Sequence, residues 1–275
     1  MPSTFEIVIN CNFKVKGKIM VIRFILITIF LVSVGSSRAC ENKIYDVVVI
    51  GDSQTGAFWA KSYFGNFLAK CLKGDFKVYG RGGTQPIHWI SSSRMDKIPT
   101  IQRDRVNHHQ NIGNKNKVPY CKKRIKNILE THNAKKVLFF FGDNLLLRGK
   151  KSIANQFLKL SNIARNAGFR RENCFILTPT FEMEVRSKRN SKHKNLKNTL
   201  KVIDAARKGG SENCQVISGV DLMKDSPFLK KDKTLKRIKY QNLPSCLGRA
   251  SNDNTHYCGY AAKEFAEKVC QIMNN

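Results

Sequence analysis

The chain has 275 residues, of which 41% are hydrophobic, so it holds enough apolar material for one buried core. This composition excludes a disordered tail, a coiled coil and a collagen-like chain. The 49 Lys and Arg residues outnumber the 20 Asp and Glu residues and give a net charge of +29. Such a charge favours attraction to polyanions but does not indicate a fold or a reaction.

The first part of the chain is typical of a secretory signal peptide. Lysines precede an apolar run at residues 20–34, and the small residues Ser37 and Ala39 follow it, a pattern that predicts cleavage after Ala39. The alternative is an uncleaved membrane anchor, but the run is short for the roughly 20 residues that a span needs. We therefore predict a signal peptide and preceding leader over residues 1–39, one domain over residues 40–275, and a secreted or periplasmic location.

The cysteines agree with export. Eight of the nine lie beyond residue 39, and an oxidising compartment favours their pairing into disulfides. No Cys-x-x-Cys pair occurs, and no cysteines lie with histidines at zinc spacing, so we expect no metal site. A lipid-attached Cys40 is a weaker alternative, because Ser37-Arg38-Ala39 lacks the aliphatic residue usual at such sites.

Short apolar strands alternate with helical stretches along the rest of the chain. Strands are predicted at residues 46–50, 76–79, 137–141, 174–177 and 214–218, and helices near residues 57–72, 120–132, 151–167, 195–208 and 259–272. This alternation indicates a parallel sheet covered by helices on both faces. Residues 91–119 and 219–252 are polar, and we expect them to be irregular excursions over the edge where the parallel strands end, which is where such sheets bind ligands.

Ser53 follows the first predicted strand in Gly51-Asp52-Ser53. A serine between a strand and a helix lies near the helix amino end, where partial positive charge favours a developing anion. This position suits a nucleophile. It also suits an ordinary helix-capping serine, so Gly-Asp-Ser alone does not decide between them.

Asp253 and His256 stand near the other end of the chain, just before the last predicted helix. A serine hydroxyl needs a base to remove its proton, and the base needs a carboxylate to orient it. Three residues of loop are enough to bring Asp253 onto the far nitrogen of His256. The alternative is a solvated aspartate beside a surface histidine.

Two further strand ends carry hydrogen-bond donors. The second strand is followed by glycines that end at Gly83, and the third is followed by Asn144. A glycine backbone N–H, an asparagine amide and the N–H of Ser53 are suitable donors to an oxyanion. Each also has a purely structural interpretation, since glycines form turns and asparagines cap helices.

These four groups, in this order, resemble the four sequence blocks of the SGNH hydrolases, also called the GDSL family. The resemblance spans residues 46–272 and implies a three-layer α/β/α fold with a mostly parallel five-stranded sheet of flavodoxin-like type. It implies Ser53 as the nucleophile, His256 as the base and Asp253 as its orienting carboxylate. The oxyanion donors would be Ser53, Gly83 and Asn144, without a cofactor.

The chain departs from the family pattern at three places. Gln54 stands where the family has leucine, Leu145 replaces a common aspartate, and no asparagine precedes the glycines after the second strand. The choice of Gly83 over Gly80 or Gly82 rests on the small polar residue Thr84 that follows it. None of the departures removes a group of the implied triad or oxyanion hole.

Cys246 and Cys258 flank the segment that holds Asp253 and His256. We hypothesise that they form a disulfide, because a small closed loop would hold the base in place. The alternative is that each cysteine pairs elsewhere in the chain.

Basic residues concentrate at 186–194 and 230–239. They form either solvated surfaces or a contact with an anionic envelope surface, where attraction depends on salt. Neither segment interleaves aromatics with its cations, as single-strand nucleic-acid binders do, so we do not expect nucleic acid as a partner.

Together these features predict a monomeric, exported serine esterase. Its ester substrate is expected to carry a short acyl group, with O-acetyl groups on an envelope glycan first and a lipid ester second. The same residues would also serve an O-acyltransferase. The alternative from another class is a catalytically weak or inactive protein of this fold that binds an envelope polyanion.

Overall fold

The computed structural model describes residues 10–15, 18–23, 43–56, 63–91, 100–103, 110–112, 124–180, 182–183, 196–227, 229–231, 238–240 and 259–275. The chain divides into two units, Met1–Glu41 and Asn42–Asn275. In the first unit, β1 (Asn10–Val15) and β2 (Lys18–Arg23) form an antiparallel pair. The predicted cleavage site at Ala39 lies outside the described residues, so the signal peptide stays a prediction.

The second unit is built on a sheet with the strand order β10-β8-β7-β3-β4-β5-β6. Five of these strands are parallel to one another: β3 (Tyr45–Gly51), β4 (Phe76–Gly80), β7 (Ala134–Phe140), β8 (Cys174–Leu177) and β10 (Gln215–Ile217). Counted along the chain, their order is the 2-1-3-4-5 order of flavodoxin-like sheets. The predicted fold class is confirmed.

The two predicted excursions contain regular structure, which corrects the expectation that they are irregular. Residues 91–119 supply β5 (Thr100–Arg103) and β6 (Gln110–Ile112), which extend the sheet antiparallel beside β4. Residues 219–252 supply α7 (Gly219–Met223), β11 (Leu229–Lys231) and β12 (Ile238–Tyr240), and β12 pairs with β9 (Glu182–Met183). These strands have two to four residues and are rich in polar side chains, so they lack the apolar run that marks a buried parallel strand.

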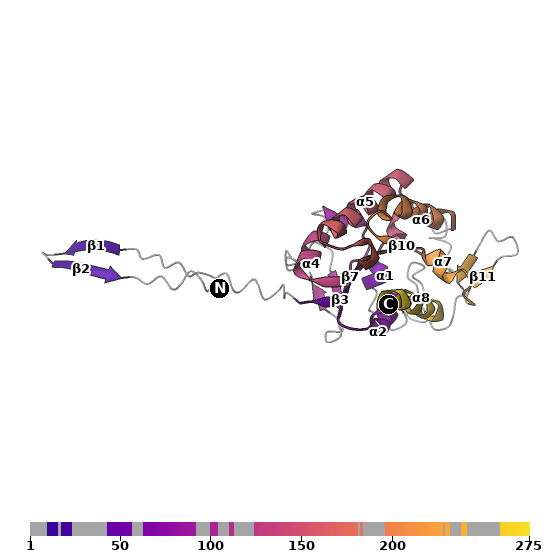
Figure 1. The fold of residues 1–275 in the computed structure, drawn as a ribbon, viewed down its shortest axis with the longest axis horizontal. Coiled ribbons are helices and arrows are strands. Elements are labelled where there is room, and N and C mark those ends of the chain that lie inside the picture. The colour runs from indigo at the N-terminus through magenta and orange to yellow at the C-terminus, as the bar shows by residue number, and fades with distance from the viewer. Residues whose placement is uncertain are drawn as a thin grey trace. The chain divides into compact units, whose positions relative to one another are not determined.

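Helices cover both faces of the large sheet (Figure 1). One face is covered by α2 (Phe64–Cys71) and α8 (Gly259–Asn274). The other is covered by α4 (Ile125–Thr131) and α5 (Lys150–Asn166), with α6 (Leu196–Gly210) packed against α5. Alternate residues of each central strand therefore enter opposite cores, which explains why these strands are apolar throughout.

Two disulfides lie among the described residues of this unit. Cys71 at the end of α2 is bonded to Cys270 in α8, and Cys174 at the start of β8 is bonded to Cys214 just before β10. The prediction of disulfides is confirmed for these four cysteines, and it indicates an oxidising location. Cys246 and Cys258 lie outside the described residues. Within the described part of the chain, no helix is long and apolar enough to cross a membrane.

Candidate active site

Ser53 lies where β3 gives way to α1 (Ser53–Gly56), at the edge formed by the carboxyl ends of the parallel strands, which we call the carboxyl edge. The turn is closed by Asp52, whose Oδ1 accepts a 2.9 Å hydrogen bond from the backbone N–H of Gln54. The N–H of Gly56 donates to the carbonyl of Asp52 at 3.1 Å. The sequence thus forms the predicted strand-to-helix turn with Ser53 as the first helical residue.

Glycines allow α1 to lie directly against the neighbouring strand. A Cβ atom on Gly80 would come within 2.3 Å of the backbone nitrogen of Gly56, and a Cβ on Gly51 would come within 2.5 Å of the carbonyl oxygen of Phe140. Gly80 therefore serves the packing of α1 on β4. This role separates it from the glycines that follow in the next turn.

The turn after β4 is exposed at Gly83, the predicted oxyanion donor. Gly83 has a φ of +68°, a left-handed conformation that favours glycine, and nothing lies within 4 Å of the position its Cβ would take. Thr84 beneath it is buried; its hydroxyl donates to the carbonyl of Arg81 at 2.9 Å and accepts from the indole N–H of Trp89 at 3.0 Å. The turn is thus anchored on its inner side and open on its outer side.

Asn144 joins the three central strand ends. It lies in the 3-10 turn Asp143–Leu145 that follows β7. Its amide donates to the carbonyl of Thr84 at 3.1 Å and to Oδ2 of Asp52 at 3.4 Å. The structure therefore brings Asn144 against the neighbours of both Ser53 and Gly83, as expected if the three groups act at one place.

Gln54 makes a second connection between the same loops. Its side chain is buried, and its amide donates to the carboxylate of Asp143, the residue before Asn144. The sequence shows Gln54 only as a departure from the family pattern, and no role was predicted for it. The available signal was a polar residue at a position where the family carries an apolar one.

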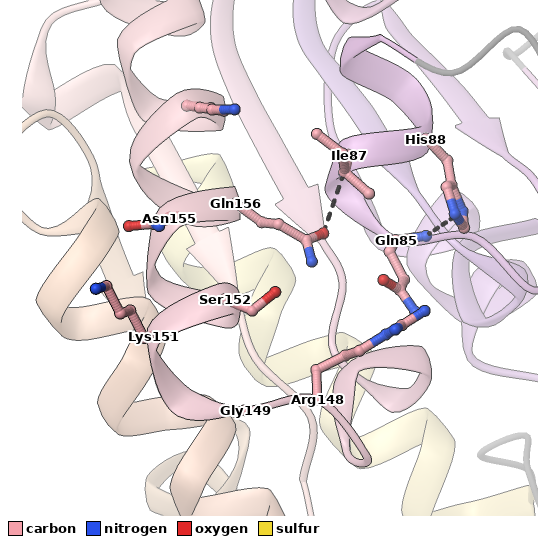
Figure 2. A pocket seen from close by; sticks show the side chains of 10 residues that line it. Gln85, Ile87, His88, Arg148, Gly149, Lys151, Ser152, Asn155 and Gln156 are labelled. Carbon is pink, nitrogen blue, oxygen red and sulfur yellow. Dashed lines mark hydrogen bonds between the residues drawn. The ribbon is translucent and has the colours of Figure 1, made fainter.

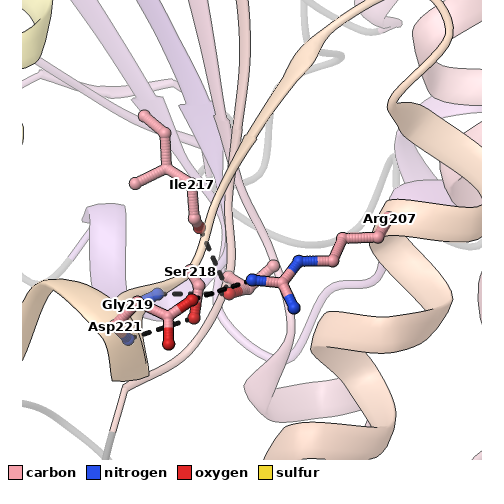
Figure 3. Close-up of polar contacts among 6 residues, drawn as sticks. Arg207, Ile217, Ser218, Gly219 and Asp221 are labelled. Carbon is pink, nitrogen blue, oxygen red and sulfur yellow. Dashed lines mark hydrogen bonds and ion pairs between the residues drawn. The ribbon is translucent and has the colours of Figure 1, made fainter. Parts of the chain in front are cut away.

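The other half of the carboxyl edge is closed by side chains. The hydroxyl of Thr178, after β8, donates to the carbonyl of Ile217 at 3.2 Å and accepts from the N–H of Gly219 at 3.3 Å. Ser218 caps α7 by accepting from the N–H of Asp221 at 3.1 Å (Figure 3). These bonds join the ends of β8 and β10 to each other and to α7.

Asp253 and His256 lie outside the described residues. The described chain resumes with α8, which begins at Gly259. The contacts of α8 show at which edge of the sheet Gly259 lies.

The direction of α8 relative to the sheet follows from two contacts at different positions along the helix. Near its end, the carbonyl of Met273 accepts a 3.0 Å hydrogen bond from Lys136, close to the start of β7. Further back, the rings of Phe265 and Phe140 are 6.0 Å apart, and Phe140 is the last residue of β7. Gly259 lies six residues before Phe265, which is about 9 Å further along a helix. The helix therefore begins at the carboxyl edge.

The described residues contain no group of three His, Cys, Asp or Glu side chains placed to hold a metal ion. The chemistry available at the described edge is that of a hydroxyl beside backbone and amide N–H donors. Such groups suit nucleophilic attack with stabilisation of an oxyanion.

Comparison with known proteins finds similar folds only. No family model and no curated protein matches the chain. Among solved structures, the chain is similar to Est24, a carbohydrate acetylesterase from Sinorhizobium meliloti (TM-score 0.48, 10% identity, 84% of this chain and 97% of that one). It is also similar to a carbohydrate acetylesterase family member from the same organism (TM-score 0.46, 14% identity, 83% of this chain and 98% of that one). A third similar structure is the M. smegmatis aryl esterase (TM-score 0.44, 13% identity, 84% of this chain and 99% of that one). Proteins this distant share folds without necessarily sharing functions.

Proposed function

We propose that the protein is an exported serine esterase that cleaves an acyl group from a hydroxyl-bearing carrier. The observation that carries this proposal is the pair of hydrogen bonds from Asn144 to Asp52 and Thr84. They gather the proposed nucleophile Ser53 and the proposed donors Gly83 and Asn144 at one edge of the sheet.

In the proposed reaction, the Ser53 hydroxyl attacks the ester carbonyl while His256 takes its proton. Asp253 orients the imidazole and stabilises its protonated form. The tetrahedral oxyanion accepts hydrogen bonds from the N–H groups of Ser53 and Gly83 and from the Asn144 amide. His256 then gives the proton to the departing alcohol, and water hydrolyses the acyl-enzyme by the same route.

The start of α8 supports the role of His256. Gly259 lies at the carboxyl edge, and three residues of chain span at most about 10 Å. We therefore propose that His256 reaches the Ser53 hydroxyl from this edge, with Asp253 only three residues before it in the sequence.

The bonds of Asn144 support its role as an oxyanion donor. Its amide carries two N–H groups, and the shorter bond, 3.1 Å to Thr84, holds the side chain in position. The bond to Asp52 is longer, at 3.4 Å. Because this bond is longer than the usual N–H···O range, we propose that the second N–H is the one that turns to a developing oxyanion.

The family resemblance and the predicted export favour a short acyl group as the substrate. We propose O-acetyl groups on an envelope glycan first and a lipid ester second. A different substrate would leave the proposed roles of the triad residues unchanged.

The proposed activity is tested with residues 40–275 and two general ester substrates, p-nitrophenyl acetate and p-nitrophenyl butyrate. We expect turnover of both, faster for acetate, which is lost in Ser53→Ala. The matched control is Ser218→Ala, a serine that caps α7 on the other half of the edge. Turnover no higher than that of Ser53→Ala at every pH between about 6 and 9 would contradict the proposal, since histidine bases of enzymes operate in this range.

A further inference from the structure

A polar pocket lies next to the proposed site, between α3 (Pro86–Ile90) and the first half of α5 (Figure 2). Its volume is about 710 Å³, which is within the range of sites for small organic ligands, about 300 to 1,000 Å³. No sequence pattern indicates this pocket, because its walls come from two segments about sixty residues apart.

The pocket carries unbalanced positive charge. Arg148, Lys151 and Lys159 line it, and no Asp or Glu is among its lining residues. In the described part of the chain, none of these three cations forms an ion pair, whereas Lys135 at the opposite edge of the sheet is 2.8 Å from a carboxylate oxygen of Asp46. The pocket therefore offers charge that an anionic ligand can neutralise.

The rest of the lining consists mainly of hydrogen-bonding groups. Gln156 is buried, and its carbonyl oxygen accepts a 3.2 Å bond from the N–H of Ile87, which leaves its amide nitrogen toward the pocket (Figure 2). Ser152 and Asn155 also line it, and Ile87 is the one hydrophobic side chain among the lining residues. Such a lining offers hydrogen-bond partners to the hydroxyl groups of a sugar.

Gln85 connects the pocket to the proposed oxyanion hole. It lines the pocket, and its amide donates to the carbonyl of Asn144 at 2.7 Å. Arg148 follows Asn144 by four residues, and its side chain extends toward Gln85 (Figure 2). A group held in the pocket would therefore lie beside an ester held at Ser53.

We propose that this pocket binds an acidic sugar unit of the ester's carrier, with its carboxylate held by Arg148, whose side chain extends toward Gln85. The inference rests on the proposed esterase activity for the position of the ester, but the binding itself requires no turnover. A guanidinium binds a carboxylate through two parallel hydrogen bonds, and the unpaired lysines raise the local concentration of anions. The acidic sugar, not its acyl group, would then decide which esters are cleaved.

The test compares two substrates that differ only in charge. One is an O-acetylated oligogalacturonide, and the other is the same oligomer with its carboxylates methyl-esterified; acetate release is measured for both. We expect kcat/KM to be at least about tenfold higher for the charged oligomer, through KM, because hydrogen bonds between charged groups contribute this much. Arg148→Gln should remove most of this preference, and Lys151→Gln a smaller part of it, without changing turnover of p-nitrophenyl acetate.

The matched control is Lys70→Gln, which removes the same charge from an exposed position on α2, on the other face of the sheet. It should leave the preference unchanged. Equal kcat/KM values for the two oligomers would overturn the proposal. So would an equal loss of the preference in Lys70→Gln and Arg148→Gln, because the charged oligomer would then be attracted by the positive charge of the whole protein and not by the pocket.

A second measurement separates this inference from the proposed activity. Calorimetric titration of Ser53→Ala protein with trigalacturonate reports binding without turnover. Binding that weakens about tenfold when Arg148→Gln is added, and not when Lys70→Gln is added, supports the pocket even if the protein hydrolyses no ester. Absence of binding to trigalacturonate overturns the inference even if p-nitrophenyl acetate is turned over.

Discussion

The two halves of the carboxyl edge are built differently. At the ends of β3, β4 and β7, amide side chains hold the loops together and leave Gly83 exposed. At the ends of β8 and β10, the hydroxyls of Thr178 and Ser218 are used in joining the strands and capping a helix. The polar residues that follow the strands thus leave N–H donors exposed in the first half, whereas in the second half they hold the backbone together. Substitutions in the first half should change activity, and those in the second should change stability.

The largest expected effect in the first half is that of Asn144→Ala. Loss of one oxyanion donor lowers kcat by about 10² to 10³-fold. The matched control is Asn213→Ala, whose amide donates to Asn162 at 2.8 Å just before the start of β10, away from the carboxyl edge. It should leave kcat unchanged. A kcat for Asn144→Ala within threefold of the unmodified protein would remove Asn144 from the proposed oxyanion hole.

The largest expected effect on stability is the loss of the disulfide that joins the starts of β8 and β10, away from the carboxyl edge. The double variant Cys174→Ala and Cys214→Ala opens a loop whose ends are 40 residues apart, and we expect the free energy of unfolding to fall by about 2 to 4 kcal/mol. Urea titration measures this change. The folded variant should keep its kcat, and a large loss of kcat in protein that is still fully folded would contradict the confinement of activity to the first half of the carboxyl edge.

Gln54→Leu sharpens the comparison within the first half, because it restores the residue that the family carries. It removes the hydrogen bond to Asp143 that positions the loop of Asn144. We expect kcat to fall about tenfold with KM nearly constant, as for the loss of one hydrogen bond to a charged group. Gln215→Leu, which removes an amide bonded to the carbonyl of Glu172, is the control. Equal kcat values for the two variants would leave Gln54 with a structural role only.

The smallest expected effect is that of Ser218→Ala. It removes the N-cap of α7, which typically contributes about 1 kcal/mol. Thermal unfolding should show a modest decrease in Tm, with ester turnover unchanged. A loss of turnover without a decrease in Tm would place Ser218 in the active half of the edge.

Structure could be predicted from the sequence wherever a single physical requirement decides which residue types an element contains. The five parallel strands are buried on both faces, so their apolar runs identify them. The turn at Gly51-Asp52-Ser53 needs small and capping residues, which are also visible in the sequence. The fold class and the placement of Ser53 and Asn144 at the same edge were therefore predictable.

Other features depend on contacts that no local pattern records. β5 and β6 are short, polar edge strands whose pairing is decided by β4 beside them. The Gln54 and Asp143 contact joins residues 89 positions apart. The basic pocket combines lysines spaced along α5 with Gln85 from another segment. In the sequence, these residues resemble ordinary solvated positions.

The central claim is that Ser53 is an activated nucleophile, and labelling with a fluorophosphonate followed by peptide mass spectrometry tests it without knowledge of the substrate. We expect the label on Ser53, its loss in His256→Ala and a decrease in Asp253→Asn, which removes the orienting carboxylate. An unlabelled Ser53, or labelling of Ser53 that persists in His256→Ala, would contradict the account.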